Sequence, residues 1–173
     1  MKINVVAVKK IIMILLIIAI ALTVAFIFSN SMKSKEESSK ESGKVGDIIA
    51  EIIPPDTSLG AAIQKNLRKI AHFSEFGALG IEVALYICLF VKKRVRAALV
   101  SPVFSLIVGF SDETIQIFSE RGHSITDVWI DVGGFCFFSL LSYGVIFLAA
   151  LFARWIISLY KNKKALIAEE NDG

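Results

Sequence analysis

Polar side chains recur at helical spacing inside the longest apolar segments of this sequence. Three segments each carry a pair of polar residues three or four positions apart: His72 and Glu75, Asp112 and Gln116, and Asp127 and Asp131. A further acid, Glu113, follows Asp112 in the stretch GFSDETIQIF. Side chains at these spacings share one side of a helix. The sequence therefore predicts a polar stripe on each of three helices.

An imidazole and several carboxylates that meet in one place could do acid–base chemistry or hold a cation. His72, Asp112 and Glu113 are the candidate catalytic residues, because a histidine or a carboxylate can take a proton from a reacting group. The acids together could hold a divalent cation such as Mg²⁺ or Ca²⁺, which prefer oxygen ligands, and no other cofactor is indicated. The sequence contains no G-x-S-x-G nucleophile motif and no phosphate-binding loop. Whether the protein is an enzyme therefore stays open.

The composition places these residues in a membrane protein. The chain has 173 residues, of which 55% are hydrophobic, and its mean hydropathy is +0.67. Its charged residues gather between long apolar runs, and a run of about 20 residues crosses a bilayer as a helix. Cys88 and Cys136 both lie within apolar runs, and their spacing fits no metal motif. These features predict an all-α, multi-pass membrane bundle with about four transmembrane helices.

The apolar runs predict four membrane spans. We expect them at Ile11–Phe28 and at about residues 70–91, 97–118 and 127–152. A signal peptide has an apolar region of about 7–15 residues, and the first run is longer than that. We therefore expect the first helix to be retained in the mature protein.

The spans divide the chain into four parts. We expect an N-terminal transmembrane helix over residues 1–28, an external polar segment with short amphipathic helices over 29–69, a three-helix membrane core over 70–160 and a cytoplasmic tail over 161–173. Residues 29–46 are rich in serine, lysine and glutamate, which predicts a solvated and flexible stretch. Pro54 and Pro55 are expected to break the amphipathic helices.

Positive charges set the orientation of these helices. Lysines precede the first span, the basic cluster 92–96 separates the second span from the third, and further basic residues follow the fourth. Basic loops face the cytoplasm, which predicts a cell-membrane protein with both termini cytoplasmic. The third helix then runs outward, and Asp112 lies about 9 Å below its outer end at about 1.5 Å per residue. The other two polar stripes reach a similar depth.

Acids at this depth are costly unless something satisfies them. Each costs about 2.5–3.5 kcal/mol at the centre of an isolated spanning helix, and less near the surface. Asp127 could cap the fourth helix, since it lies near the positive N-terminal end. Capping cannot explain Asp112 and Glu113, which approach the C-terminal end of an outward-running helix. Two explanations stay open: a shared outward-facing site, or a structural network within the bundle.

The same residues carry a family resemblance. Three ordered blocks, RKIAHFSEFGALG (68–80), SDETIQIFSER (111–121) and DVWIDVGG (127–134), resemble the VanZ-like family of small bacterial membrane proteins. The resemblance implies a ligand-binding set at the motif positions of the family: Lys69, His72, Asp112, Glu113, Gln116, Arg121, Asp127 and Asp131. Glu75 joins this set through its spacing from His72. Phe76 stands where the family usually has tyrosine.

The resemblance implies a function in the cell envelope. The family is named for an accessory protein of glycopeptide resistance linked with teicoplanin, so antibiotic resistance is the expected phenotype. We expect the polar site to bind or act on a cell-wall precursor, another lipid-linked ligand or the glycopeptide, with Arg121 holding an anionic group. Membrane lipids are further expected partners. Nucleic acid is not, because the topology explains the basic residues.

Two other functions stay open at this point. The protein could be a non-catalytic structural or accessory membrane protein whose polar residues only hold the bundle together. It could also be a small ion-coupled transporter that uses Glu82 and the carboxylates as a relay. Four helices are few for a transporter, and the sequence shows no internal repeat.

The topology can be tested by labelling single cysteines in a chain whose two native cysteines are replaced. A cysteine at position 93 is expected to react only with membrane-permeant reagents, because the basic loop 92–96 faces the cytoplasm. A cysteine at position 39 is the control and is expected to react with impermeant reagents added outside. External labelling at position 93 would overturn the orientation.

Overall fold

The structure confirms the all-α membrane bundle that the sequence predicts. It is a computed structural model that describes residues 5–119 and 124–172, with side chains described as far as Asn162. Within these residues there are five helices and no strand, and four of the helices are long and apolar enough to cross a membrane. The helices are α1 (Val5–Ser31), α2 (Lys35–Ile52), α3 (Ser58–Phe90), α4 (Arg94–Phe118) and α5 (Ile125–Asp172).

Helix α1 is almost entirely apolar from Ile11 to Phe28, between two lysines near its start and the residues Ser-Asn-Ser at its end. A helix that is apolar on all sides is typical of a membrane span. It lies against α3 and α4. Most of its side chains are exposed on the surface of the bundle, but Ile27 and Ser31 near its C-terminal end are buried. Helix α1 is therefore most closely joined to the bundle at that end.

Helix α2 occupies most of the stretch that we expected to be flexible, and that expectation is wrong for residues 35–46. A capping box begins the helix: Glu37 N donates to the Ser34 hydroxyl at 3.2 Å, and Ser34 N donates to the Glu37 carboxylate at 3.0 Å. These hydrogen bonds lower the pKa of Glu37, because they favour its charged form. Contact with α3 also holds the helix, since Gln64 Nε2 donates to Gly46 O at 2.7 Å.

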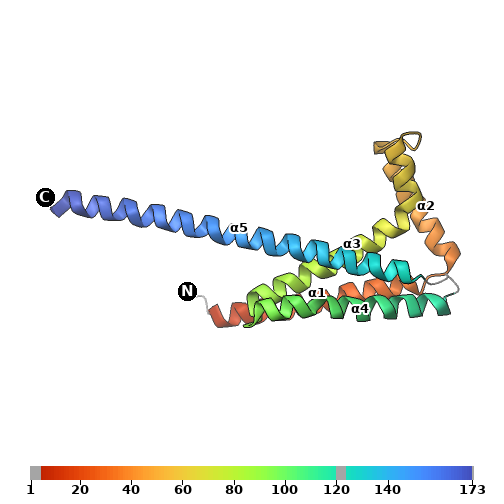
Figure 1. Cartoon of the computed structure of the whole chain (residues 1–173), viewed down its shortest axis with the longest axis horizontal. Coiled ribbons are helices and arrows are strands. Elements are labelled where there is room, and N and C mark those ends of the chain that lie inside the picture. The colour runs from red at the N-terminus through yellow and green to blue at the C-terminus, as the bar shows by residue number, and fades with distance from the viewer. Residues whose placement is uncertain (1–4, 120–123, 173) are drawn as a thin grey trace.

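Helix α3 begins well before the expected start of the second span. Pro54 and Pro55 separate it from α2, as the sequence predicts. Thr57 caps it by accepting a hydrogen bond from Gly60 N at 3.0 Å. No proline follows within α3, so the helix continues unbroken to Phe90. Its first part packs on α2 and projects sideways from the bundle (Figure 1).

Helices α3 and α5 form the closest interface of the bundle. A Cβ added at Gly134 would lie 2.2 Å from Phe73 O, and one added at Gly80 would lie 2.4 Å from Phe135 O. Glycine at such positions lets membrane helices approach closely. Across the same interface, the Ser139 hydroxyl donates to Gly80 O at 3.0 Å.

Helix ends meet at one end of the bundle, which we call the site end. Helices α1 and α4 end there and α5 begins there, on the right of Figure 1. The Ser119 hydroxyl, just after α4, donates to Ser31 O at the end of α1 at 2.6 Å. A small apolar core joins α1, α3, α4 and α5: Ile27, Phe76, Leu79, Val108 and Phe135.

Helix α5 is longer than the expected fourth span. It continues past residue 152 and through the expected tail as far as Asp172. Its 48 residues are about 72 Å long at about 1.5 Å per residue, whereas the hydrocarbon core of a bilayer is about 30 Å thick. Its C-terminal part extends well beyond the other helices (Figure 1).

Adjacent glycines on α5 give a matched test of the helix interface. Gly134→Ala places a methyl group against Phe73 O, so we expect it to lower the free energy of unfolding by about 1–3 kcal/mol. Gly133→Ala is the control, because a Cβ at Gly133 meets no atom within 4 Å. Thermal unfolding in detergent measures both variants. Equal unfolding temperatures for the two would contradict the close contact between α3 and α5.

Candidate functional site

Buried ionisable and amide side chains gather at the site end from three helices. They are His72 on α3, Asp112, Glu113 and Gln116 on α4, and Asp131 on α5. His72 Nδ1 lies 3.4 Å from Asp131 Oδ1 and 3.8 Å from Asp112 Oδ2. The fold thus brings one imidazole and two carboxylates together from distant parts of the sequence.

Asp112 lies at the centre of a hydrogen-bond network, and its side chain is fully buried. The Ser31 hydroxyl of α1 donates to Asp112 Oδ1. Gln116 Nε2, one turn further along α4, donates to Asp112 Oδ2 at 2.8 Å. Hydrogen bonds of this kind satisfy a carboxylate that has been removed from water. Helix α1 is therefore part of the site and more than a membrane anchor.

Gln116 connects this network to α3. Its Oε1 accepts a hydrogen bond from the Arg68 guanidinium. Its Nε2 donates to Asp112 and also to Glu113 Oε1, the latter at 3.2 Å. Gln116 is fully buried, so removing Arg68 would leave the buried Oε1 of Gln116 without this donor, which costs about 1–3 kcal/mol.

Asp131 has a different environment from Asp112. Its side chain is 0% exposed, yet neither carboxylate oxygen accepts a hydrogen bond within the part of the chain that the structure describes. His72 Nδ1, which lies 3.4 Å away, also has no hydrogen bond there. Burial of a carboxylate without such partners is costly. Asp131 and His72 are thus the members of the group whose polar atoms are least satisfied.

Glu113 and Asp127 are associated with the start of α5. Glu113 Oε2 accepts a hydrogen bond from Ser124 N, just before the helix, at 2.6 Å. Asp127 is half-buried in the first turn of α5, where the helix dipole favours an acid. Among the described residues, neither acid lies within ligand distance of the group formed by His72, Asp112 and Asp131.

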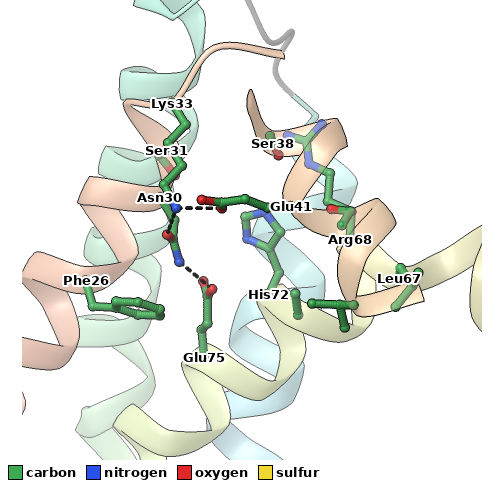
Figure 2. A pocket seen from close by; sticks show the side chains of 13 residues that line it. Phe26, Asn30, Ser31, Lys33, Ser38, Glu41, Leu67, Arg68, His72 and Glu75 are labelled. Carbon is green, nitrogen blue, oxygen red and sulfur yellow. Dashed lines mark hydrogen bonds and ion pairs between the residues drawn. The ribbon is translucent and has the colours of Figure 1, made fainter. Parts of the chain in front are cut away.

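A cavity of about 250 Å³ opens beside the polar group, among α1, α2 and α3. His72 and Glu75 line it from α3, and Asn30 lines it from α1 (Figure 2). Asn30 Nδ2 donates to Glu75 Oε1 at 2.8 Å, and Lys33 pairs with Glu41 at 2.6 Å; all four residues line the cavity (Figure 2). The cavity therefore gives access to His72 from the side of α2.

Three other sequence candidates lie away from this cavity or outside the structure. Lys69 is exposed and does not line the cavity, whereas the preceding residue, Arg68, does. Neighbours on an α-helix point about 100° apart, so only one of them can face the site. Glu82 lies further along α3, and its Oε1 accepts a hydrogen bond from the Thr23 hydroxyl at 2.9 Å. Arg121 lies outside the described residues.

Asn30, Ser31 and Arg68 are site residues that the sequence patterns do not predict. Asn30 and Ser31 belong to the triplet SNS that directly follows the apolar run of α1. That abrupt change to polar residues is the one available signal. Arg68 is adjacent to Lys69, and only the rotation of α3 about its axis decides which of the two faces the site.

The fold and this site define a multi-pass helical membrane protein with a buried polar group at one end of its bundle. The chain belongs to the VanZ/LLP1 family, whose family model matches residues 13–154. This match confirms the resemblance carried by the three sequence blocks, and it includes the part of α1 that supplies Asn30 and Ser31. No curated protein and no solved structure matches the chain.

Replacing Gln116 by glutamate tests the network. Gln116→Glu keeps an acceptor for Arg68 but replaces the donor, which lies 2.8 Å from Asp112 Oδ2, by a second carboxylate oxygen. We expect the free energy of unfolding to fall by about 1–3 kcal/mol. Asn66→Asp makes the same chemical change at an exposed hydrogen bond within α3 and is the control. If both variants unfold at the temperature of the wild type, the network does not hold the helices.

Proposed function

We propose that this protein is a cell-envelope membrane protein whose cavity binds the polar head of a cell-wall or lipid-linked ligand, thereby lowering susceptibility to glycopeptides such as teicoplanin. The observation that carries this proposal is the cavity at the site end, which lies directly beside a buried imidazole. Membership of the VanZ/LLP1 family supports the connection with glycopeptides.

The chemistry of the cavity walls suits an amphiphilic ligand. Arg68 offers positive charge, which pairs well with phosphate or carboxylate groups, whereas Lys33 is paired with Glu41 of the same wall. Ser38 and Ser42 on α2 offer hydroxyl groups that both donate and accept hydrogen bonds. Apolar side chains complete the wall: Phe26, Val45 and Leu67. A ligand with a charged or hydroxylated head and an apolar portion matches this lining.

The location of the cavity also supports a ligand that lies at the membrane surface. The cavity opens where α1 ends and where α2 packs on the projecting part of α3 (Figure 1). In the topology predicted from the basic loops, this end of the bundle faces outward. The head of a lipid-linked ligand would reach it from the outer surface without leaving the membrane.

If the bound ligand also reacts, His72 is the best candidate for a general base. It is the member of the buried polar group that both lines the cavity and lies next to carboxylates, at 3.4 and 3.8 Å. A carboxylate beside an imidazole can orient it and stabilise its protonated form. Asp112 would act through His72, since two hydrogen bonds already hold its carboxylate.

A structural function is the second candidate, and the network around Asp112 favours it. Ser31, Arg68, Asp112 and Gln116 connect α1, α3 and α4 through hydrogen bonds. Such a network could fix the packing of three membrane helices without binding anything. In that case, variants would lose the phenotype only when they unfold.

Filling the cavity distinguishes these two functions, because it leaves the buried network intact. Ser42→Trp places an indole in the cavity, whereas Ser39→Trp lies on the exposed side of α2 and does not line this cavity. We expect cells with Ser42→Trp to be as susceptible to teicoplanin as cells without the protein, and cells with Ser39→Trp to resemble the wild type. Membrane level and unfolding temperature should match in all three. Full function of Ser42→Trp at normal levels would contradict binding in the cavity.

A further inference from the structure

The side chains of His72, Asp112 and Asp131 place one potential ligand atom each within a small space. The three atoms, an imidazole nitrogen and two carboxylate oxygens, all lie within 4.8 Å of one another. They come from α3, α4 and α5, so each helix of the membrane core supplies one. We infer that these residues form a binding site for a divalent transition-metal ion of the Zn²⁺ type.

The distances fit a tetrahedral ion. Bonds from Zn²⁺ to nitrogen and oxygen ligands are about 2.0–2.1 Å long, so neighbouring ligand atoms of a tetrahedral site lie about 3.3–3.4 Å apart. The distance from His72 Nδ1 to Asp131 Oδ1 is 3.4 Å, and that from His72 Nδ1 to Asp112 Oδ2 is 3.8 Å. The two carboxylate oxygens lie within 4.8 Å of each other, so the Asp112 and Asp131 carboxylates would have to move together slightly around the ion.

Unsatisfied buried atoms are the second, independent observation. Asp131 is 0% exposed, and neither of its oxygens accepts a hydrogen bond within residues 5–119 and 124–162. His72 Nδ1 is directed toward it without a hydrogen bond of its own in that part of the chain. Buried polar groups in proteins are normally paired, and buried charges are paired or coordinate metals. A cation between these two side chains would satisfy both.

Neighbouring side chains provide the support that metal ligands usually have. Gln116 donates to the same Asp112 oxygen that faces His72, at 2.8 Å, and Ser31 donates to the other oxygen. Arg68 in turn donates to Gln116. Hydrogen bonds of this kind orient ligating carboxylates and tune the affinity for the metal.

The ligand types decide the class of metal. Mg²⁺ and Ca²⁺ are bound through oxygen atoms, whereas an imidazole ligand suits zinc and related transition metals. Three protein ligands leave a fourth tetrahedral position, which is the arrangement of zinc sites that bind an exogenous group. His72 and Ser31 also line the cavity, so the inferred site lies directly beside it, while the His72 Nδ1 atom and the carboxylates of Asp112 and Asp131 are buried.

Metal titration of the purified full-length chain in detergent tests this inference. After removal of metals with a chelator, we expect one Zn²⁺ per chain by dialysis and elemental analysis. Asp131→Asn keeps the shape of the side chain and is expected to weaken Zn²⁺ binding by more than about 100-fold, beyond the 10–100-fold loss typical of supporting residues. Asp127→Asn, one turn away on α5, is the matched control and should bind like the wild type.

Cobalt gives a second readout, because tetrahedral Co²⁺ absorbs visible light far more strongly than Co²⁺ with six ligands. We expect this absorption in the wild type and in Asp127→Asn, and its loss in Asp131→Asn and Asp112→Asn. If Asp131→Asn does not accumulate, Asp112→Asn carries the comparison.

Three results would overturn the inference: no stoichiometric Zn²⁺ in the wild type, equal affinity in wild type and Asp131→Asn, or displacement of Zn²⁺ by equimolar Mg²⁺ or Ca²⁺. These measurements need no envelope ligand and no living cells. Failure of the metal site is therefore distinguishable from failure of the proposed cavity function, which depends on Ser42→Trp and teicoplanin susceptibility.

Discussion

The buried carboxylate of Asp112 is the interaction on which the arrangement of the site end depends. It accepts hydrogen bonds from Ser31 on α1 and from Gln116 on its own helix, and Gln116 reaches Arg68 on α3. A carboxylate in a membrane bundle cannot rely on water, so these partners have to come from the protein itself, both from its own helix and from others. Satisfying one acid therefore holds the C-terminal ends of α1 and α4 against α3, and the cavity lies beside this arrangement, among α1, α2 and α3.

A second constraint determines how His72 meets Asp131. Gly80 and Gly134 let α3 and α5 approach very closely. At either position, the Cβ atom of any other residue would overlap the backbone of the facing helix. This contact lies within a few helical turns of both His72 and Asp131 on their helices. Polar atoms 3.4 Å apart on different helices require such close backbones, because both side chains are short. The apolar core around Phe76 and Leu79 fills the space below them.

Much of this architecture could be predicted from the sequence, because bilayer thickness and backbone hydrogen bonding leave few choices for an apolar run. The four spans and the convergence of His72, Asp112 and Asp131 at one depth follow from length and spacing alone. The rotation of each helix about its own axis does not follow from length and spacing. Spacing could not show that Arg68, and not Lys69, lines the cavity. It also could not show that Glu113 accepts a hydrogen bond from Ser124. Helix α2 was missed because its composition resembles a flexible linker, while a capping box and contact with Gln64 stabilise it.

The contrast between the two aspartates bears on why polar residues are present in this membrane bundle at all. Apolar side chains often stabilise a core as well as a buried polar network does, so stability alone is a weak reason to keep one. Asp112 nevertheless has a structural explanation, since its hydrogen bonds and the one from Arg68 to Gln116 together connect three helices. Asp131 has none of this kind: it is fully buried, its carboxylate accepts no hydrogen bond among the described residues, and its contact with His72 Nδ1 at 3.4 Å is an ion pair only when His72 is protonated. A purely structural network explains why Asp112 is buried. It does not explain Asp131, whose burial lowers the stability of the bundle. The pair formed by Asp131 and His72 therefore lies outside the hydrogen-bond network that joins the helices.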